Sequence, residues 1–306
     1  MIQRSQYVNS KNIWYKNMID YKIAVIGDIH SNYVGLERCI EHALKQNPDE
    51  FLFLGDYISD CPYPQKTMKI VYEMDRDYKC RFIRGNREDY MLNHRKNPGE
   101  RWTYSSASGS LLYTYENLTE WDFQFFESLD IKGYYEKEGY QSFRYCHGSF
   151  ARSNEILEPD GENTIQLMKS LDVDLLVSGH VHFQEEKVYD GKKILHPGAV
   201  GVSWYFDGKT QYMMLHGSKN GWEAEFFQLD YDVERLVKDF ELSGLHEKAP
   251  AWSKITIHTL RTGTDRNLAC LTRASELCKE AEGSVNWPDI PEKYWNQTLK
   301  EFGIAD

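Results

Sequence analysis

Long apolar runs are missing from this chain of 306 residues, and their absence excludes several classes of protein. No segment approaches the roughly 18 to 20 apolar residues that a membrane helix needs, and the N-terminus lacks the apolar core of a signal peptide. The six cysteines form no CxxC pair and no dense framework, which favours reduced and mostly buried thiols over a disulfide scaffold. We therefore predict a cytoplasmic protein with no membrane partner.

Positive charge is also scarce. The chain has 36 Lys and Arg residues against 47 Asp and Glu residues, so its formal net charge at pH 7 is −11. Long nucleic acids are bound mainly through clustered Lys and Arg, and we predict no such partner here. A small phosphate ester or nucleotide stays compatible with this charge, because bound metal ions concentrate positive charge locally.

What the sequence does contain is a series of five polar blocks, each after an apolar run that predicts a β-strand. The strands are predicted at residues 21–26, 50–54, 80–83, 143–145 and 174–178. The blocks that follow them contain Asp28 with His30, Asp56, Asn86, His147, and His180 with His182. Loops beyond the carboxyl ends of strands are where sites form in α/β proteins, so we expect these side chains to cluster.

Together the blocks resemble the D-x-H, G-D, G-N-H-E/D, x-H-G and G-H-x-H pattern of the calcineurin-like metallophosphoesterase superfamily. Segments 55–64 and 194–201 resemble its small bacterial phosphodiesterase branch, and 226–233 resembles asymmetric dinucleoside tetraphosphatases. The resemblance covers roughly residues 21–201. It implies an α/β (α+β) fold, a four-layer α/β/β/α sandwich of two mixed sheets flanked by helices.

The resemblance also implies two divalent metal ions. One ion would be held by Asp28, His30, Asp56 and His182, and the other by Asp56, Asn86, His147 and His180, with Asp56 bridging. Mixed Asp and His ligands suit Mn, Fe, Zn or Ni, and we favour manganese for activity in vitro. A hydroxide shared by the ions would attack phosphorus in line. The implied activity is a metal-dependent phosphohydrolase acting on small phosphodiesters or phosphoanhydrides, dinucleoside polyphosphates among them.

Arg87 departs from the superfamily pattern, because monoester phosphatases have His at this point. Arginine cannot donate a proton near neutral pH, since its pKa exceeds about 12, but it can make a forked contact to phosphate. We predict Arg87 as a catalytic and substrate-binding residue, and Asn32 and His196 as further substrate-binding residues. Asn32 is equally compatible with starting a helix. Asp60 is placed to accept the second N–H of a ligand histidine.

The departure at Arg87 favours the phosphodiesterase branch. The alternatives are a phosphomonoesterase or protein phosphatase, and a non-catalytic metal-binding scaffold.

Three zones are predicted along the chain: an N-terminal extension at 1–20, a catalytic domain at 21–230 and a helical C-terminal extension at 231–306 packed on it. Residues 101–135 interrupt the alternation of strand and helix and form either a cap over the site or a packing helix with a surface loop. Apolar stripes predict helices from 233 and at 266–282. We predict that these helices serve in packing, at the rim of the substrate site or in a dimer contact. A homo-oligomer is compatible with them.

Overall fold

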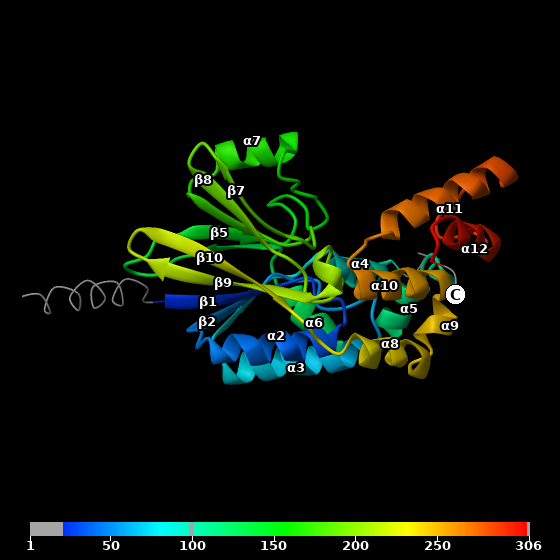
Figure 1. Cartoon of the computed structure of the whole chain (residues 1–306), viewed down its shortest axis with the longest axis horizontal. Coiled ribbons are helices and arrows are strands. Elements are labelled where there is room, and N and C mark those ends of the chain that lie inside the picture. The colour runs from blue at the N-terminus through cyan, green and yellow to red at the C-terminus, as the bar shows by residue number, and fades with distance from the viewer. Residues whose placement is uncertain (1–20, 98–100, 305–306) are drawn as a thin grey trace, which may run out of the picture.

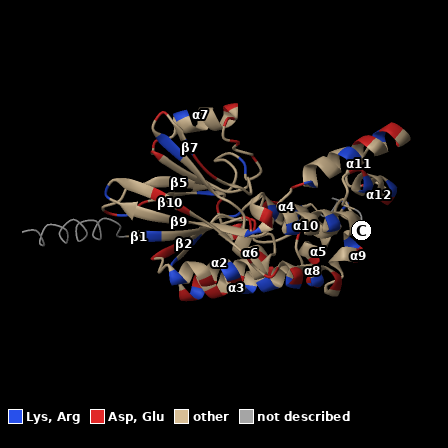
Figure 2. Ribbon diagram, in the orientation of Figure 1, with Lys and Arg blue, Asp and Glu red and all other residues tan. Residues whose placement is uncertain are grey.

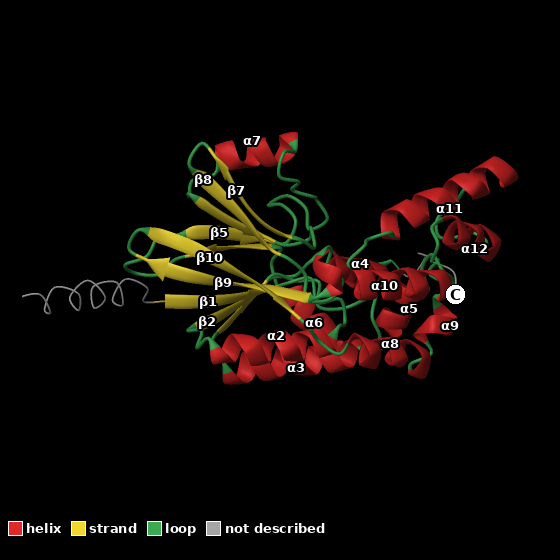
Figure 3. Cartoon of the chain, viewed as in Figure 1, coloured by secondary structure: helices red, strands yellow, loops and turns green. Residues whose placement is uncertain are grey.

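The computed structural model describes residues 21–97 and 101–304, so the predicted N-terminal extension lies outside the described residues. Two five-stranded mixed sheets face each other (Figure 3). The first has the order β10-β9-β1-β2-β3, with strands β1 (Tyr21–Ile26), β2 (Glu50–Phe53), β3 (Cys80–Phe82), β9 (Thr210–Ser218) and β10 (Gly221–Leu229). The second has the order β4-β5-β6-β8-β7, with β4 (Lys132–Tyr135), β5 (Phe143–Cys146), β6 (Leu175–Ser178), β7 (Gln184–Tyr189) and β8 (Lys192–Pro197).

Helices cover the outer faces of both sheets, which confirms the predicted four-layer sandwich (Figure 1). The first sheet is covered by α2 (Tyr33–Lys45), α3 (Pro64–Asp77), α4 (Asn86–Lys96) and α6 (Glu120–Ser128). Helix α7 (Glu162–Ser170) packs on the second sheet through the buried Met168. Helix α3 carries charges of both signs, Lys66 and Lys69 near its start and Glu73, Asp75, Arg76 and Asp77 near its end (Figure 2).

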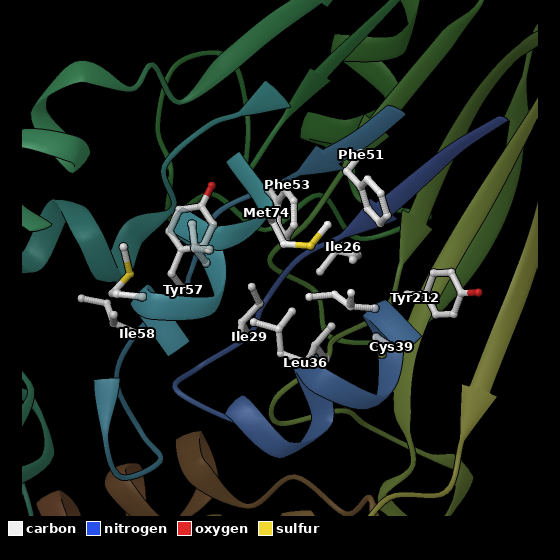
Figure 4. Close-up of a cluster of buried hydrophobic side chains, with 14 of the residues drawn as sticks. Ile26, Ile29, Leu36, Cys39, Phe51, Phe53, Tyr57, Ile58, Met74 and Tyr212 are labelled. Carbon is white, nitrogen blue, oxygen red and sulfur yellow. The ribbon is translucent and has the colours of Figure 1, made fainter. Parts of the chain in front are cut away.

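Strand β1 shows how the layers share side chains. Ile23 and Val25 point into the core between the two sheets, whereas Ala24 and Ile26 point into the core under the helices. Successive side chains of a strand lie on opposite faces, so an apolar run buries both. Figure 4 shows the core under the helices, where Ile26 lies near Leu36 of α2 and aromatic side chains of β2.

Local sequence signals account for the boundaries of several elements. Pro64 opens α3 as its first residue, where its missing N–H costs nothing. Asp190 and Gly191, an Asp-Gly pair between two strands, form the β7–β8 turn with φ values of 47° and 83°, the geometry of a type I′ hairpin. Strands β9 and β10 also pair as an antiparallel hairpin.

The segment 101–135 contains two helices. Helix α6 agrees with the prediction, and its buried side chains are Phe123 and Phe126, while Trp121 is 66% exposed. Helix α5 (Gly109–Glu116) is not predicted by the pattern, because it begins with glycine and serine rather than with an apolar stripe. Trp102 stacks on His94 of α4 with ring centroids 3.9 Å apart. A cap role for this segment stays a prediction.

The described tail consists of helices α8 (Val233–Leu242), α9 (Leu245–Lys248), α10 (Pro250–Thr262), α11 (Asn267–Glu282) and α12 (Glu292–Glu301). The predicted stripe of α8 buries Leu236 and Phe240 against the start of α2. Trp295 of α12 is fully buried in a cluster with apolar residues of α10 and α11. Among the described residues, no helix combines the length and the apolarity needed to cross a membrane.

Candidate metal centre

Six of the seven predicted ligands lie on loops that follow strands of the two sheets, and Asn86 is the first residue of α4. Five of the seven have left-handed backbone, namely Asp28, His30, Asp56, His180 and His182, with φ values of 52°, 49°, 51°, 71° and 55°. This conformation is costly for residues other than glycine and clusters at functional sites. Hydrogen bonds between the loops hold it, since the N–H groups of Ile29 and His30 both donate to the Asp56 carbonyl, at 2.8 and 2.9 Å.

The side chains of these loops converge in two sets that share Asp56. One set contains Asp28, His30, Asp56 and His182, and the other contains Asp56, His147 and His180; in each, one ligand atom per residue lies within 4.8 Å of the others. The Oδ1 atom of Asp56 lies 3.4 Å from His147 Nε2, and its Oδ2 atom lies 3.6 Å from His30 Nε2. The predicted ligand Asn86 also reaches this centre, with its Oδ1 atom 3.2 Å from His147 Nε2.

Three of the histidines direct Nδ1 at an oxygen that can only accept a hydrogen bond. His147 donates to the Leu54 carbonyl at 2.7 Å, and His182 donates to the Val202 carbonyl at 2.8 Å. His30 Nδ1 lies 2.8 Å from Asp60 Oδ2, as the sequence predicts. In a neutral ring with its proton on Nδ1, the Nε2 lone pair would face the centre, as in metal-binding histidines.

One contact in this centre requires a proton or a cation between two rings. His30 Nε2 and His182 Nε2 lie 3.0 Å apart. Two lone pairs at this distance repel unless a cation or a proton lies between them. The donor set of carboxylate, amide and imidazole atoms fits divalent transition metals.

The electrostatics of the centre agree with this requirement. Burial alone would lower the pKa of His147, but the carboxylates of Asp56 and Asp28 raise it to about 10. Burial would likewise raise the pKa of Asp56, yet His147, His30 and Arg87 hold it well below its usual value. His180 differs, because burial and the neighbouring His147 lower its pKa to about 4. The carboxylates therefore create a buried negative field that favours bound cations.

Glu88 joins two of the loops and was not assigned a role from the sequence. Its carboxylate is fully buried and accepts hydrogen bonds from the N–H groups of Gly85, Asp56 and Tyr57, at 2.7, 2.9 and 2.8 Å. Burial and the charge of Asp56 raise the pKa of Glu88 to about 8. The only local signal is its place two residues after Asn86 in the third block.

Arg87 points toward the centre. Its Nη2 atom lies 3.1 Å from Asp60 Oδ2 and its Nε atom 3.9 Å from Asp56 Oδ2. Asp60 in turn accepts a hydrogen bond from the Trp252 indole N–H of α10, at 2.8 Å. Asp60 thus ties together His30, Arg87 and Trp252. No local pattern marks Trp252, because it lies 192 residues from its partner.

The two other predicted substrate-binding residues lie at the edge of the centre. Asn32 caps α2, since its Oδ1 atom accepts from Gly35 N at 2.8 Å and its Nδ2 atom donates to Gly201 O at 3.0 Å. Both ends of this amide are therefore engaged within the protein, in agreement with the helix-starting alternative. His196 is buried and donates from Nδ1 to the Ser178 carbonyl at 2.9 Å. Substrate binding by either residue stays a prediction.

Comparisons with known proteins agree with this geometry. The family model for calcineurin-like phosphoesterases matches residues 21–184. An uncharacterised protein of Methanocaldococcus jannaschii is 23% identical over 244 residues, covering 72% of this chain and 94% of that protein.

Two solved structures share the fold over their whole length. A hypothetical protein of Pyrococcus horikoshii superposes with a TM-score of 0.67 at 16% identity and covers 80% of this chain. A metallophosphoesterase of Sphaerobacter thermophilus superposes with a TM-score of 0.62 at 20% identity and covers 79% of this chain. In both cases the superposition spans 100% of the other protein's chain.

Replacing the shared carboxylate tests the metal centre. Asp56→Asn should lose at least one of two bound ions and most of the activity, because an amide supplies one neutral oxygen where the carboxylate supplies two charged ones. Elemental analysis of the purified protein measures this. The matched control is Asp190→Asn in the β7–β8 turn, which should keep full metal content; unchanged stoichiometry in Asp56→Asn would exclude a bridging role.

Trp252→Phe tests the contact between the tail and the centre. The variant keeps most of the ring volume but removes the hydrogen bond to Asp60, so His30 and Arg87 lose part of their support. We expect manganese affinity or kcat to fall about 10-fold, the lower end of what loss of an outer partner costs. Calorimetric titration with Mn²⁺ and steady-state kinetics measure it, with Trp121→Phe as the exposed control. A lower melting temperature with unchanged metal affinity and kcat would reduce Trp252 to a packing residue.

Proposed function

The chain belongs to the calcineurin-like phosphoesterase family and is a metal-dependent phosphoesterase; we propose that its substrates are small phosphodiesters or phosphoanhydrides, dinucleoside polyphosphates among them. The observation that carries the dinuclear form of this proposal is the pair of donor sets that share Asp56. An ion in each set would relieve the repulsion between lone pairs that face each other across the centre.

In this proposal Asp28, His30, Asp56 and His182 hold one ion, and Asp56, Asn86, His147 and His180 hold the other. When bound, the ions would supply Lewis acidity toward phosphate and would lower the pKa of water. The protein's own contribution is to fix the direction of each donor. The backbone carbonyls of Leu54 and Val202 and the carboxylate of Asp60 orient the imidazoles, so little reorganisation is needed when charge develops.

Arg87 is the cation that the chain itself adds to this centre. Its side chain is 21% exposed and its Nε atom, which is buried, has no hydrogen-bond partner among the described residues. The Oδ2 atom of Asp56 is 3.9 Å away from that atom. We propose that the guanidinium group donates to a phosphate oxygen and stabilises negative charge in the transition state.

The leaving group receives no proton from Arg87, because a guanidinium stays protonated near neutral pH. Among the described residues, the imidazoles in the two donor sets are committed to ligation in this proposal. His196 lies behind them, and burial lowers its pKa to about 4, so it is neutral near neutral pH. The proposed substrates therefore have leaving groups that are stable as anions, such as aryl oxides and nucleoside phosphates.

A panel of esters tests this substrate class. With Mn²⁺ bound, the enzyme should hydrolyse bis-aryl phosphodiesters or dinucleoside polyphosphates faster than alkyl phosphomonoesters, because only the latter need protonation of the departing oxygen. Values of kcat/KM measured at one metal concentration give the order. A clear preference for alkyl monoesters would contradict the proposal and would favour the phosphomonoesterase alternative.

Arg87→Ala isolates the role of the guanidinium group. Loss of one charged contact made mainly in the transition state should lower kcat/KM on the best phosphodiester by about 30- to 1000-fold, or about 2 to 4 kcal/mol. Metal content should stay unchanged, because Asn86 supplies the ligand of this block. Elemental analysis and kinetics on the same samples measure both quantities.

The control for this variant is Arg95→Ala on the same helix, where the exposed guanidinium pairs with Glu120 and should have no effect on the rate. Arg87→His should raise activity on monoesters relative to diesters, because an imidazole can protonate the leaving oxygen. Full kcat/KM in Arg87→Ala would remove Arg87 from the mechanism.

A further inference from the structure

Aromatic side chains gather beside the ligand His182. We propose that Phe183, Trp204 and Tyr205, here called the aromatic platform, bind the nucleobase that stays attached to phosphorus when a nucleoside phosphate ester is hydrolysed. This inference rests on the proposed function, because the platform acts on a substrate that the metal centre hydrolyses. Nucleobases stack on aromatic side chains whatever their hydrogen-bonding pattern.

The platform is continuous with the metal centre. The ring centroid of Trp204 lies 5.4 Å from that of His182, and the ring of Phe183 stacks on Trp204 at 6.1 Å with an interplanar angle of 28°. Tyr205 extends the cluster, with its ring 6.3 Å from that of Phe183. A ring attached to a phosphate at the metal centre therefore meets an aromatic surface next to a ligand.

The backbone of Trp204 is fixed to the same ligand. Its N–H donates to the His182 carbonyl at 2.9 Å, and its carbonyl accepts from the Gln211 side chain at 3.2 Å. The Trp204 ring is thus attached to the loop that carries His182 and forms part of the same rigid end of the sheets.

Beyond Trp204 the chain adopts a strained conformation that presents apolar side chains to solvent. Tyr205, Phe206 and Asp207 all have left-handed backbone, with φ values of 67°, 50° and 55°. Tyr205 is 64% exposed and Phe206 is 49% exposed. Packing does not explain this arrangement, because strain of this kind is normally compensated by burial or retained for binding.

The end of α10 holds the loop in place. Tyr205 N donates to the Gly263 carbonyl at 2.7 Å, and Gly263 caps α10 with a φ of 65°. A Cβ atom on Gly263 would lie 2.3 Å from the Tyr205 carbonyl oxygen, and one on Gly208 would lie 2.1 Å from that of Leu260. Both glycines are therefore required for the close approach that fixes the platform.

Two esters with the same leaving group test the platform. Thymidine 5′-(p-nitrophenyl phosphate) and methyl p-nitrophenyl phosphate differ only in the group that stays on phosphorus. The manganese-loaded enzyme should prefer the nucleoside ester. Trp204→Leu and Tyr205→Asn should each reduce the ratio of the two kcat/KM values by about tenfold, the loss expected for one stacked base. Asparagine tolerates the left-handed backbone at position 205, so that variant keeps the loop intact.

A binding measurement supplements the kinetics. In calorimetric titrations, the affinity for thymidine 5′-monophosphate relative to methyl phosphate should fall by the same factor in both variants. Trp121→Leu, on the exposed face of α6, is the matched control and should change neither ratio.

The outcomes separate the platform from the proposed function. Unchanged ratios with retained activity would overturn the platform and leave the proposed function standing. An equal loss on both esters would assign these residues to the support of His182 and would also overturn base binding. No hydrolysis of either ester by the wild-type enzyme with metal bound would overturn the proposed function itself and the platform with it.

Discussion

The repulsion among lone pairs and carboxylates at the end of the two sheets is the constraint on which the rest of the structure depends. His30 and His182 face each other through Nε2 atoms 3.0 Å apart, with the carboxylates of Asp28 and Asp56 beside them. Such a group of acceptors is unfavourable unless protons or cations lie between them. Folding energy from the surrounding cores must therefore help to hold these side chains together.

Buried polar contacts hold these side chains in place. Five of the predicted ligands have left-handed backbone, which turns their side chains toward the centre. In a regular strand, side chains would lie on alternate faces. Glu88 then fixes two loops at once through three backbone N–H groups, and Gly85 permits the approach, since a Cβ there would lie 2.1 Å from Asp56 Oδ1. These hydrogen bonds satisfy a buried carboxyl group that would be costly to leave without partners. The strain is thus offset by contacts within the same loops.

The sandwich and the convergence of the predicted ligands could be predicted from sequence because their signals are local. Each predicted ligand lies within four residues of the end of an apolar strand, and the turn at Asp190 and Gly191 is set by two adjacent residues. The contacts of Trp252 and Tyr205 have no such signal, because their partners Asp60 and Gly263 lie 192 and 58 residues away in the chain. Helix α5 was not predicted, because glycine and serine at its start give no apolar stripe and two of its buried residues are these small ones.

Helix α10 connects the C-terminal tail to the predicted metal centre, and no local sequence signal indicates this connection. Near its start, Trp252 supports Asp60 and through it His30 and Arg87. Just beyond its end, Gly263 fixes Tyr205 of the aromatic platform. One rigid helix therefore contacts both the side of the centre that carries the guanidinium group and the side where we propose that a base stacks. Because a helix keeps its two ends at a fixed separation, a displacement of α10 would change both contacts together.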